Sequence, residues 1–251
     1  MSYTTQSYQD LEDRYAATEK YVEKVCNGQF NALIINGPAG LGKTYSVESC
    51  LKKYAKKRYN VFAGHMSLLS LYGTLYNYRE AGEIVVLDDI DSVLKDVQGI
   101  NILKAAMDTK ASRAVTWKST TKLLQVMGIP SSFQFKGAVI LISNMSPQSG
   151  KSKIDSHLMA LKDRSFSITI ADSSKDSQFK QVCFMVLKRD LLKSFKLKKD
   201  QEIAVLDFIQ ANLDVLERIS LRTAVKLAQL ISQDPLTWQL MAKTGVLENF
   251  E

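Results

Sequence analysis

Gly37-Pro38-Ala39-Gly40-Leu41-Gly42-Lys43-Thr44 is a complete G-x-x-x-x-G-K-T phosphate-binding loop. The apolar run before it, residues 32 to 35, predicts a buried strand, and residues 45 to 54 carry apolar side chains at helical spacing. Glycines let successive backbone N–H groups point at phosphates, Lys43 adds a positive charge, and the Thr44 hydroxyl can ligate Mg²⁺. We predict that this loop and the following Tyr45 bind a nucleotide. The alternative is a Gly-rich turn without a ligand.

Residues 83 to 89 form a second strand-like segment, in which the apolar run 84 to 87 ends in two carboxylates, Asp88 and Asp89. This is the Walker B pattern. Asp88 would hold Mg²⁺ through its hydration shell, and Asp89 would orient or deprotonate the attacking water. An ordinary surface turn is the alternative. Asp91 precedes another apolar segment and is expected to be a helix N-cap.

A third apolar run, residues 138 to 143, ends in Asn144, whose amide could contact the γ-phosphate and the nucleophilic water. A plain turn residue is the alternative. With this motif the sequence resembles the AAA+ ATPase superfamily, in which Walker A, Walker B, sensor 1, an arginine finger and sensor 2 follow in order. The resemblance covers roughly residues 30 to 232 and identifies Asn144 as sensor 1. It implies a parallel-sheet α/β domain with a small C-terminal all-helical lid, and ATP and Mg²⁺ as cofactors.

The same resemblance gives roles to two arginines. Arg164 precedes a short predicted strand, which implies an arginine finger that reaches the nucleotide of a neighbouring subunit. An isolated surface arginine is the alternative. Arg222 opens a C-terminal helix and resembles sensor 2. A finger that acts in trans implies a head-to-tail homo-oligomer, a hexamer or a similar ring or spiral. Asp89 departs from the commoner Glu of the superfamily and has a shorter reach.

Length and composition agree with such a protein. The chain has 251 residues, 45% of them hydrophobic, which is enough for an ATPase domain and a helical lid. It has no apolar stretch of about 18 residues that could span a bilayer, and no signal-peptide core at its polar start. We therefore expect a cytoplasmic protein with no membrane partner. The three cysteines lack the paired spacing of zinc sites or disulfide frameworks.

Strand-like and helical patterns alternate in the first two thirds of the chain, which predicts a parallel sheet covered on both faces. From about residue 175 the pattern is only helical. We predict an ATPase domain at 1–173, beginning with a helix, and a helical lid at 174–251. The predicted strands are near residues 31–36, 60–64, 83–88, 137–143 and 166–170, and the predicted helices near 7–26, 175–195, 200–214, 220–232 and 235–242.

The distribution of charge suggests a partner. The net charge is +7, and residues 109 to 154 hold seven basic residues and no acidic one. Aromatic residues lie between these basic residues. This combination suits contact with a nucleic-acid backbone and occasional stacking on nucleobases. In AAA+ proteins this region, between Walker B and sensor 1, faces the central channel, often through hairpins. We predict contacts to DNA or RNA from five residues, and a solvated or interface surface is the alternative. The five are Lys110, Arg113, Trp117, Lys118 and Lys122.

Two other function classes stay open. Leu71-Tyr72-Gly73 resembles the peptide-gripping loops of AAA+ unfoldases, although the order of its residues differs and its helical spacing predicts an ordinary covering helix. The alternatives are thus a protein-remodelling ATPase and a slow, nucleotide-gated assembly scaffold. We favour a compact AAA+ ATPase that acts on nucleic acid as a helicase loader, initiator or DNA-remodelling factor. Its small size resembles phage ATPases, and a helicase or another replication protein is a candidate partner.

Overall fold

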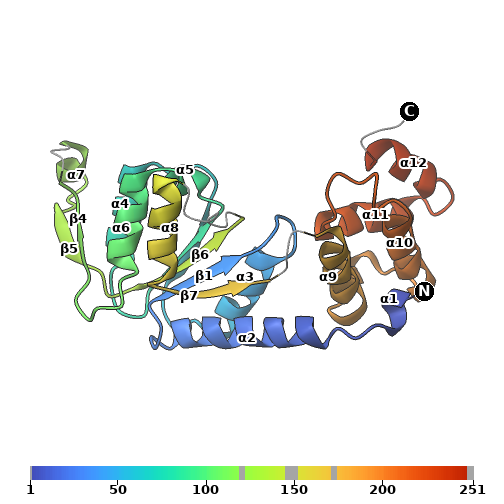
Figure 1. The fold of residues 1–251 in the computed structure, drawn as a ribbon, viewed down its shortest axis with the longest axis horizontal. Coiled ribbons are helices and arrows are strands. Elements are labelled where there is room, and N and C mark those ends of the chain that lie inside the picture. Colours follow the sequence, from blue (N-terminus) through green and yellow to red (C-terminus); the bar gives the residue numbers. More distant parts are fainter. Residues whose placement is uncertain (1, 119–121, 145–151, 171–173, 248–251) are drawn as a thin grey trace. The chain divides into compact units, whose positions relative to one another are not determined.

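The computed structural model describes residues 2–118, 122–144, 152–170 and 174–247. The chain divides into two compact units (Figure 1). The α/β unit comprises Tyr15–Gly37 and Lys43–Thr169, and the helical unit comprises Met1–Arg14, Pro38–Gly42 and Ile170–Glu251. Residues Pro38–Gly42 of the phosphate-binding loop therefore belong to the helical unit, and Gly37, Lys43 and Thr44 belong to the α/β unit.

Five parallel strands form the sheet of the α/β unit, in the order β2-β3-β6-β1-β7. Strand β6 separates β1 from β3, so Asn36, Ser143 and Asp88 end adjacent strands at one edge of the sheet. Ligands of open α/β sheets bind at such an edge. The predicted parallel sheet is confirmed. The strands are β1 (Ala32–Asn36), β2 (Tyr59–Ala63), β3 (Ile84–Asp88), β6 (Ala138–Ser143) and β7 (Phe166–Thr169).

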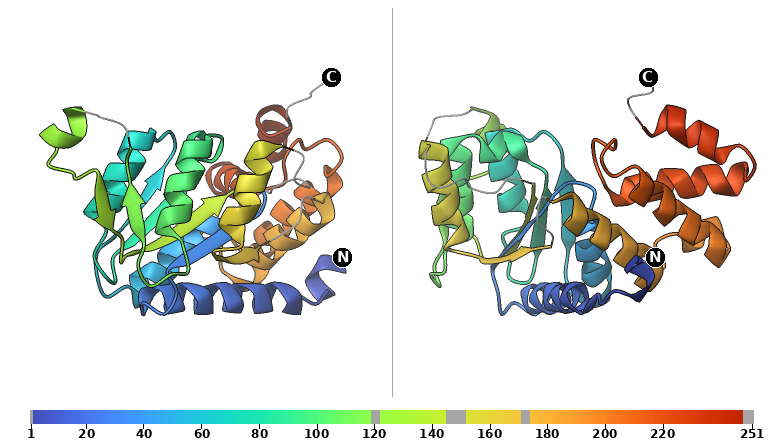
Figure 2. Two further views of the ribbon diagram at one scale, coloured as in Figure 1. Left: turned by 60° about the vertical axis from the view of Figure 1, so that its left-hand side comes forward. Right: turned by 45° about the vertical axis from the view of Figure 1, so that its right-hand side comes forward.

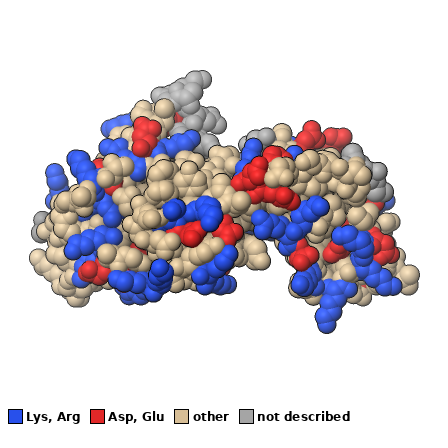
Figure 3. Space-filling model, turned by 90° about the horizontal axis from the view of Figure 1, so that it is seen from below, with Lys and Arg blue, Asp and Glu red and all other residues tan. Residues whose placement is uncertain are grey.

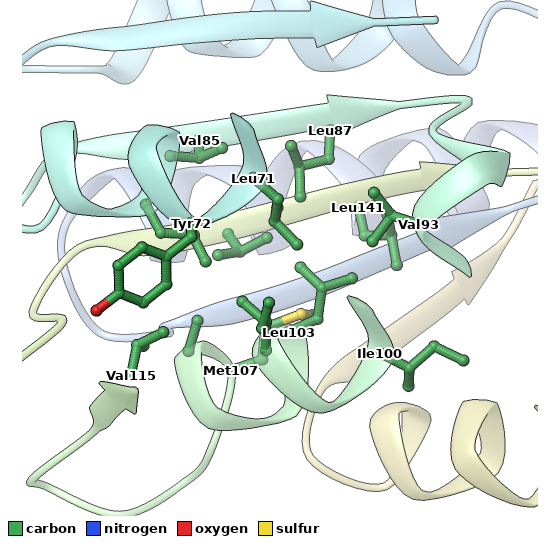
Figure 4. Packing of buried hydrophobic residues seen from close by; sticks show 14 of the residues in the cluster. Leu71, Tyr72, Val85, Leu87, Val93, Ile100, Leu103, Met107, Val115 and Leu141 are labelled. Carbon is green, nitrogen blue, oxygen red and sulfur yellow. The ribbon is translucent and has the colours of Figure 1, made fainter. Parts of the chain in front are cut away.

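Helices cover the sheet on its two faces (Figures 1 and 2). One face packs against α4 (Leu68–Asn77), α5 (Asp91–Leu94), α6 (Val97–Ala106) and α8 (Lys153–Lys162). Figure 4 shows side chains of α4, α5 and α6 against strand residues such as Val85 and Leu141. The inner strands β1, β3 and β6 are buried almost continuously, because parallel strands covered on both sides need apolar residues at successive positions, whereas the edge strands β2 and β7 are more exposed. The remaining helices of this region are α2 (Gln9–Cys26) and α3 (Lys43–Tyr54).

Tyr72 lies in the middle of α4 and is fully buried. Its hydroxyl donates to the carbonyl of Pro130 at 2.8 Å, and its ring centroid lies 5.5 Å from that of Trp117. The neighbouring Leu71 is buried as well. The prediction that this segment forms a covering helix is confirmed, and its two large side chains are not presented for gripping a peptide.

A short hairpin stands between α6 and β6. Its antiparallel strands are β4 (Ala114–Thr116) and β5 (Ser132–Gln134), and α7 (Lys122–Val126) lies between them in sequence. Only the central residue of each strand, Val115 and Phe133, is buried. Three residues with one inward side chain are too few for a clear period of two, so the strand predictions did not include them.

The position of Asp91 and the state of the cysteines can be compared with the sequence predictions. Helix α5 begins at Asp91, and its N-cap is Ile90, so the prediction of Asp91 as the N-cap is wrong by one residue. The reason is the left-handed turn at Asp89, with φ of +50°, after which the chain enters the helix at once. The three cysteines are free thiols, of which Cys26 and Cys183 are buried and Cys50 is partly exposed.

The helical unit confirms the expected all-helical C-terminal region. Helix α11 has one apolar face, on which Leu227 and Ile231 are buried, and Ser220 caps its first turn. Among the described residues no helix is long and apolar enough to cross a membrane. The elements are α1 (Ser2–Thr5), α9 (Lys175–Lys188), the 3-10 helix η1 (Lys193–Phe195), α10 (Lys199–Ala211), α11 (Leu221–Gln233) and α12 (Trp238–Gly245).

Candidate active site

Lys43 is the first residue of α3 and is buried to 5% exposure. Its ammonium donates to the carbonyl of Gly37 at 2.8 Å and to Oδ1 of Asn144 at 2.6 Å. Gly37 and Asn144 follow the ends of the adjacent strands β1 and β6. The side chain is therefore held across the sheet edge, between the phosphate-binding loop and the predicted sensor. Tyr45, in the first turn of the same helix, is exposed.

Asn144 joins Lys43 to the second Walker B carboxylate. Its amide nitrogen donates to Oδ1 of Asp89 at 2.8 Å, while its amide oxygen accepts from Lys43. An ammonium can only donate and a carboxylate can only accept, so this network determines the orientation of the amide. Lysine, amide and carboxylate thus form a chain of hydrogen bonds across β1, β6 and β3.

The backbone of Asp89 has a conformation that aspartate tolerates better than most residues. Its φ of +50° is left-handed, and its N–H donates to the carbonyl of Ile142 in β6 at 3.1 Å. This bond holds the turn after β3 against the end of β6. The short carboxylate consequently meets Asn144, although Asp reaches less far than the Glu commoner in the superfamily.

Thr44 and Asp88 form a second pair at the same edge. The threonine hydroxyl donates to Oδ2 of Asp88 at 2.6 Å. Burial raises the pKa of Asp88, and the nearby Asp89 carboxylate raises it too, while the Thr44 hydrogen bond and the charge of Lys43 lower it. A hydroxyl and a half-buried carboxylate are hard oxygen ligands, which Mg²⁺ prefers, and a cation would relieve the repulsion between the carboxylates. These residues therefore fit the predicted Mg²⁺ site.

Arg164 follows the C-terminal end of α8 and is partly exposed. Its guanidinium donates to the carbonyl of Ala160 at 2.5 Å, and its Nε lies 3.5 Å from Oδ2 of Asp108. Within the described residues these contacts join it to α8 and the end of α6, and none is made to Lys43 or Asp89. The structure thus gathers Lys43, Thr44, Asp88, Asp89 and Asn144 and leaves Arg164 outside that network.

The helical unit holds the middle of the loop, Pro38–Gly42. The carbonyl of Gly40 accepts from the N–H of Leu221 at 2.8 Å, at the start of α11. Gly40 has φ of +74°, and a Cβ there would lie 2.8 Å from Cβ of Ser220, so only glycine fits. The exposed Arg222 lines a cavity of about 200 Å³ with Ala39 and Gly40. The predicted sensor 2 therefore shares a cavity with part of the loop.

Three of the predicted nucleic-acid residues, Lys110, Lys118 and Lys122, are exposed. Trp117 is half-buried and lines a groove together with Gln98 and Asn101 of α6. Figure 3 shows a face on which basic and acidic side chains are interspersed, so positive charge is not uniform over the surface. These four residues remain available for the predicted contact.

Arg113 does not meet the same prediction, which we correct. The residue is buried to 8% exposure, and its guanidinium donates to the carbonyls of Ala106 at 2.7 Å and Gly137 at 2.9 Å. The guanidinium also lies over the ring of Phe135. By donating to these two buried carbonyl groups, the guanidinium links α6, the hairpin and the residues that precede β6. It supports the fold and does not face a polynucleotide.

Replacing Arg113 with leucine should lower the free energy of unfolding by about 3 kcal/mol, because two carbonyl groups lose charge-assisted partners in a buried place. Urea denaturation followed by circular dichroism measures the change. The matched control is Lys110→Leu, a basic residue exposed nearby, which should change the stability by about 0.5 kcal/mol or less. Equal free energies of unfolding of the two variants would contradict the buried, structural role of Arg113.

Comparison with curated proteins finds a phage relative. The chain is 31% identical over 247 residues to an uncharacterized 36.7 kDa protein from the nrdC-mobD intergenic region of enterobacteria phage T4. The match covers 94% of this chain and 76% of the phage protein. The chain belongs to this phage T4 protein family. No protein-family model matches the sequence.

This chain has the fold of AAA+ P-loop ATPases, as the order of the motifs implied. Domain III of the replication initiation protein DnaA from Thermotoga maritima is 13% identical, with a TM-score of 0.53 over 93% of this chain and 92% of that chain. A mutant form of Thermotoga maritima RuvB is 12% identical, with a TM-score of 0.53 over 92% of this chain. The chain spans 64% of that RuvB chain, less than two thirds of its length.

One polar cluster near Arg164 was not predicted from the sequence. Lys104 of α6 lies with its Nζ 3.1 Å from Nδ1 of His157 in α8. Lysine and histidine on different helices form no motif. The available signal was weak: His157 and Arg164 are two helical turns apart, and Lys104 and Asp108 are about one turn apart.

Proposed function

We propose that this protein is an AAA+ ATPase that couples Mg²⁺-dependent hydrolysis of ATP to the binding or remodelling of nucleic acid. The observation that carries the proposal is the continuous network of Lys43, Asn144 and Asp89 beside the pair of Thr44 and Asp88. It places one cation, one amide and two carboxylates at the edge of the sheet that follows β1, β6 and β3. That set contains the parts that phosphoryl transfer requires.

Each residue has a separate task in this proposal. Lys43 and the N–H groups of residues 37 and 39 to 44 would bind the phosphates, and Thr44 and Asp88 would hold Mg²⁺. When bound, Mg²⁺ neutralises charge on the phosphates and so stabilises the transition state. Asp89 accepts a proton from the attacking water or orients it. Asn144 keeps Asp89 aligned with Lys43 and can read the γ-phosphate.

We further propose that the protein assembles head-to-tail as a homo-oligomer, a ring or spiral such as a hexamer. Arg164 would complete the site of the neighbouring subunit by stabilising transition-state charge, and Arg222 would contact the nucleotide from the lid. The exposure of both side chains is compatible with these roles. The domain ranges 1–173 and 174–251, a cytoplasmic location and a helicase or other replication protein as partner belong to the same proposal.

DNA is the substrate that the comparisons favour. DnaA, whose domain III shares this fold, is described as a replication initiation protein. The exposed lysines Lys110, Lys118 and Lys122 support contact with a polyanion, and the ring of Trp117 could stack on a nucleobase. The buried Leu71 and Tyr72 give no support to peptide gripping. Helicase loading, initiation and DNA remodelling all remain roles within this proposal.

Replacing Lys110, Lys118 and Lys122 together with glutamine should weaken binding to single-stranded DNA and flatten its dependence on salt. Each lost phosphate contact removes about 0.7 to 0.9 from the slope of log affinity against log salt concentration. Fluorescence anisotropy of a labelled oligonucleotide at several salt concentrations measures both quantities. Basal ATPase should persist, because these residues lie outside the proposed nucleotide network.

The control is a triple variant of distant exposed lysines from the region of α2 and α3, Lys24, Lys52 and Lys56, which changes the net charge equally. Equal affinity and salt slope in both triple variants would reject the assigned contact surface. ATPase that responds to unfolded polypeptide, but to neither DNA nor RNA, would instead favour protein remodelling.

A further inference from the structure

Helices α6 and α8 pack side by side in the α/β unit (Figures 1 and 2). Two polar pairs join them. In the first, Nζ of Lys104 lies 3.1 Å from Nδ1 of His157, and in the second, Nε of Arg164 lies 3.5 Å from Oδ2 of Asp108. Lys104 precedes Asp108 by four residues, and His157 precedes Arg164 by seven, so the pairs form two successive rungs between the helices.

The first rung has hydrogen-bond donors beyond the bond that joins its two residues. An ammonium has no acceptor, so Nδ1 of His157 must accept from Lys104, and the imidazole proton then resides on Nε2. Burial and the charges of Lys104 and Lys153 lower the pKa of His157, which keeps the ring neutral near pH 7. The imidazole therefore offers an N–H, next to an ammonium with further donors. Arg164 adds a guanidinium fork.

The charges around this cluster are mainly positive. Burial lowers the pKa of Lys104, and the charge of Arg164 lowers it further. Asp108 offsets part of the charge, but it already accepts from the N–H of Lys110 and pairs with Arg164. Crowded cations raise the free energy of a folded chain unless an anion neutralises them. Several donors at one place suit an anion with several oxygens, such as a phosphate group.

We propose that Lys104 and His157 bind, together with Arg164, the terminal phosphates of the nucleotide held by a neighbouring copy of this chain. The proposal rests on the function proposed above, in which Arg164 acts in trans. Lys104 contributes a second positive charge to the phosphates of that neighbour, and His157 positions Lys104 and donates from Nε2. The cluster is thus a three-residue receptor rather than a single arginine finger.

A mixing experiment tests the proposal. The acceptor is Arg164→Ala, which retains its own phosphate-binding loop, and the donor is Lys43→Ala, which retains the cluster. Mixed oligomers should regain ATPase, because the intact cluster of the donor completes the site of the acceptor. Adding Lys104→Gln to the donor should lower the regained rate about tenfold. The same change in the acceptor should leave the regained rate unaltered, since Lys104 acts on the neighbour.

Two further donors make the result specific. Lys24→Gln alters an exposed residue of α2 and should leave the regained rate intact, whereas Lys104→Arg keeps the charge and should retain most of it. Equal regained rates with and without Lys104→Gln in the donor would overturn the inference. Absence of regained ATPase with the unaltered donor would instead overturn the proposed trans action of Arg164, so the two failures are distinguishable.

Assembly gives a readout that does not depend on turnover. Sedimentation velocity with a non-hydrolysable ATP analogue should show that Lys104→Gln needs about tenfold more protein to form oligomers, because contact with the neighbour's phosphates links nucleotide binding to assembly. Lys24→Gln should assemble like the wild type. If Lys104→Gln instead weakens binding to single-stranded DNA while assembly is unchanged, the cluster binds a nucleic-acid backbone and the inference is wrong.

Discussion

The Lys43→Ala variant should bind ATP about a hundredfold more weakly than the wild type. In the wild type, the ammonium of Lys43 supplies charge-assisted hydrogen bonds to phosphate, each worth about 1.5 to 3 kcal/mol. No other cation joins the described network around Asn144. Equilibrium titration with a fluorescent ATP analogue measures the dissociation constant. ATPase should fall to background at ATP concentrations that saturate the wild type.

Two variants control this experiment. Lys43→Met keeps much of the volume of the buried side chain and should lose binding equally, which separates charge from packing. Lys52→Ala removes an exposed lysine from the same helix, α3, and should bind normally. Wild-type affinity in a folded Lys43→Ala protein would contradict the proposed nucleotide site.

The Asp89→Asn variant should separate binding from chemistry. Asparagine keeps the size of the side chain and an acceptor for Asn144, so affinity for ATP should stay within about threefold. The single-turnover rate should fall by about 10² to 10⁴, the usual contribution of a positioned base. Titration with the ATP analogue and rapid-quench measurement of phosphate release provide the two numbers.

The comparison variant is Asp91→Asn, in the first turn of α5, whose carboxylate lies 3.6 Å from Nζ of Lys95. It should retain turnover within a few fold, because Asp91 is not part of the hydrogen-bond chain from Lys43 to Asp89. If Asp89→Asn still hydrolyses ATP and Asp91→Asn does not, the role of the base moves to Asp91.

Much of the fold follows from local patterns. The predicted inner strands are apolar runs followed by a turn, and the predicted lid helices have apolar side chains at helical spacing, so both are readable without tertiary information. The phosphate-binding loop is equally local, because its closely spaced glycines determine its backbone. The order of the motifs then implied the AAA+ fold, and the comparisons confirm it.

The contacts between distant segments could not be derived in this way. Asn144 joins Lys43 to Asp89 because β6 lies between β1 and β3, a strand order that no local pattern encodes. Arg113 belongs to a run of basic residues that looks exposed, yet the packing of the hairpin buries it.

The same holds for the cluster beside Arg164, where Lys104 and His157 meet because α6 and α8 pack together. Local sequence specifies the backbone, since neighbouring residues set its conformation. Burial and partner choice are set by residues from other elements, and their cost or gain exists only in the folded chain. For this protein the motifs establish the kind of site, and packing between elements establishes which side chains serve it.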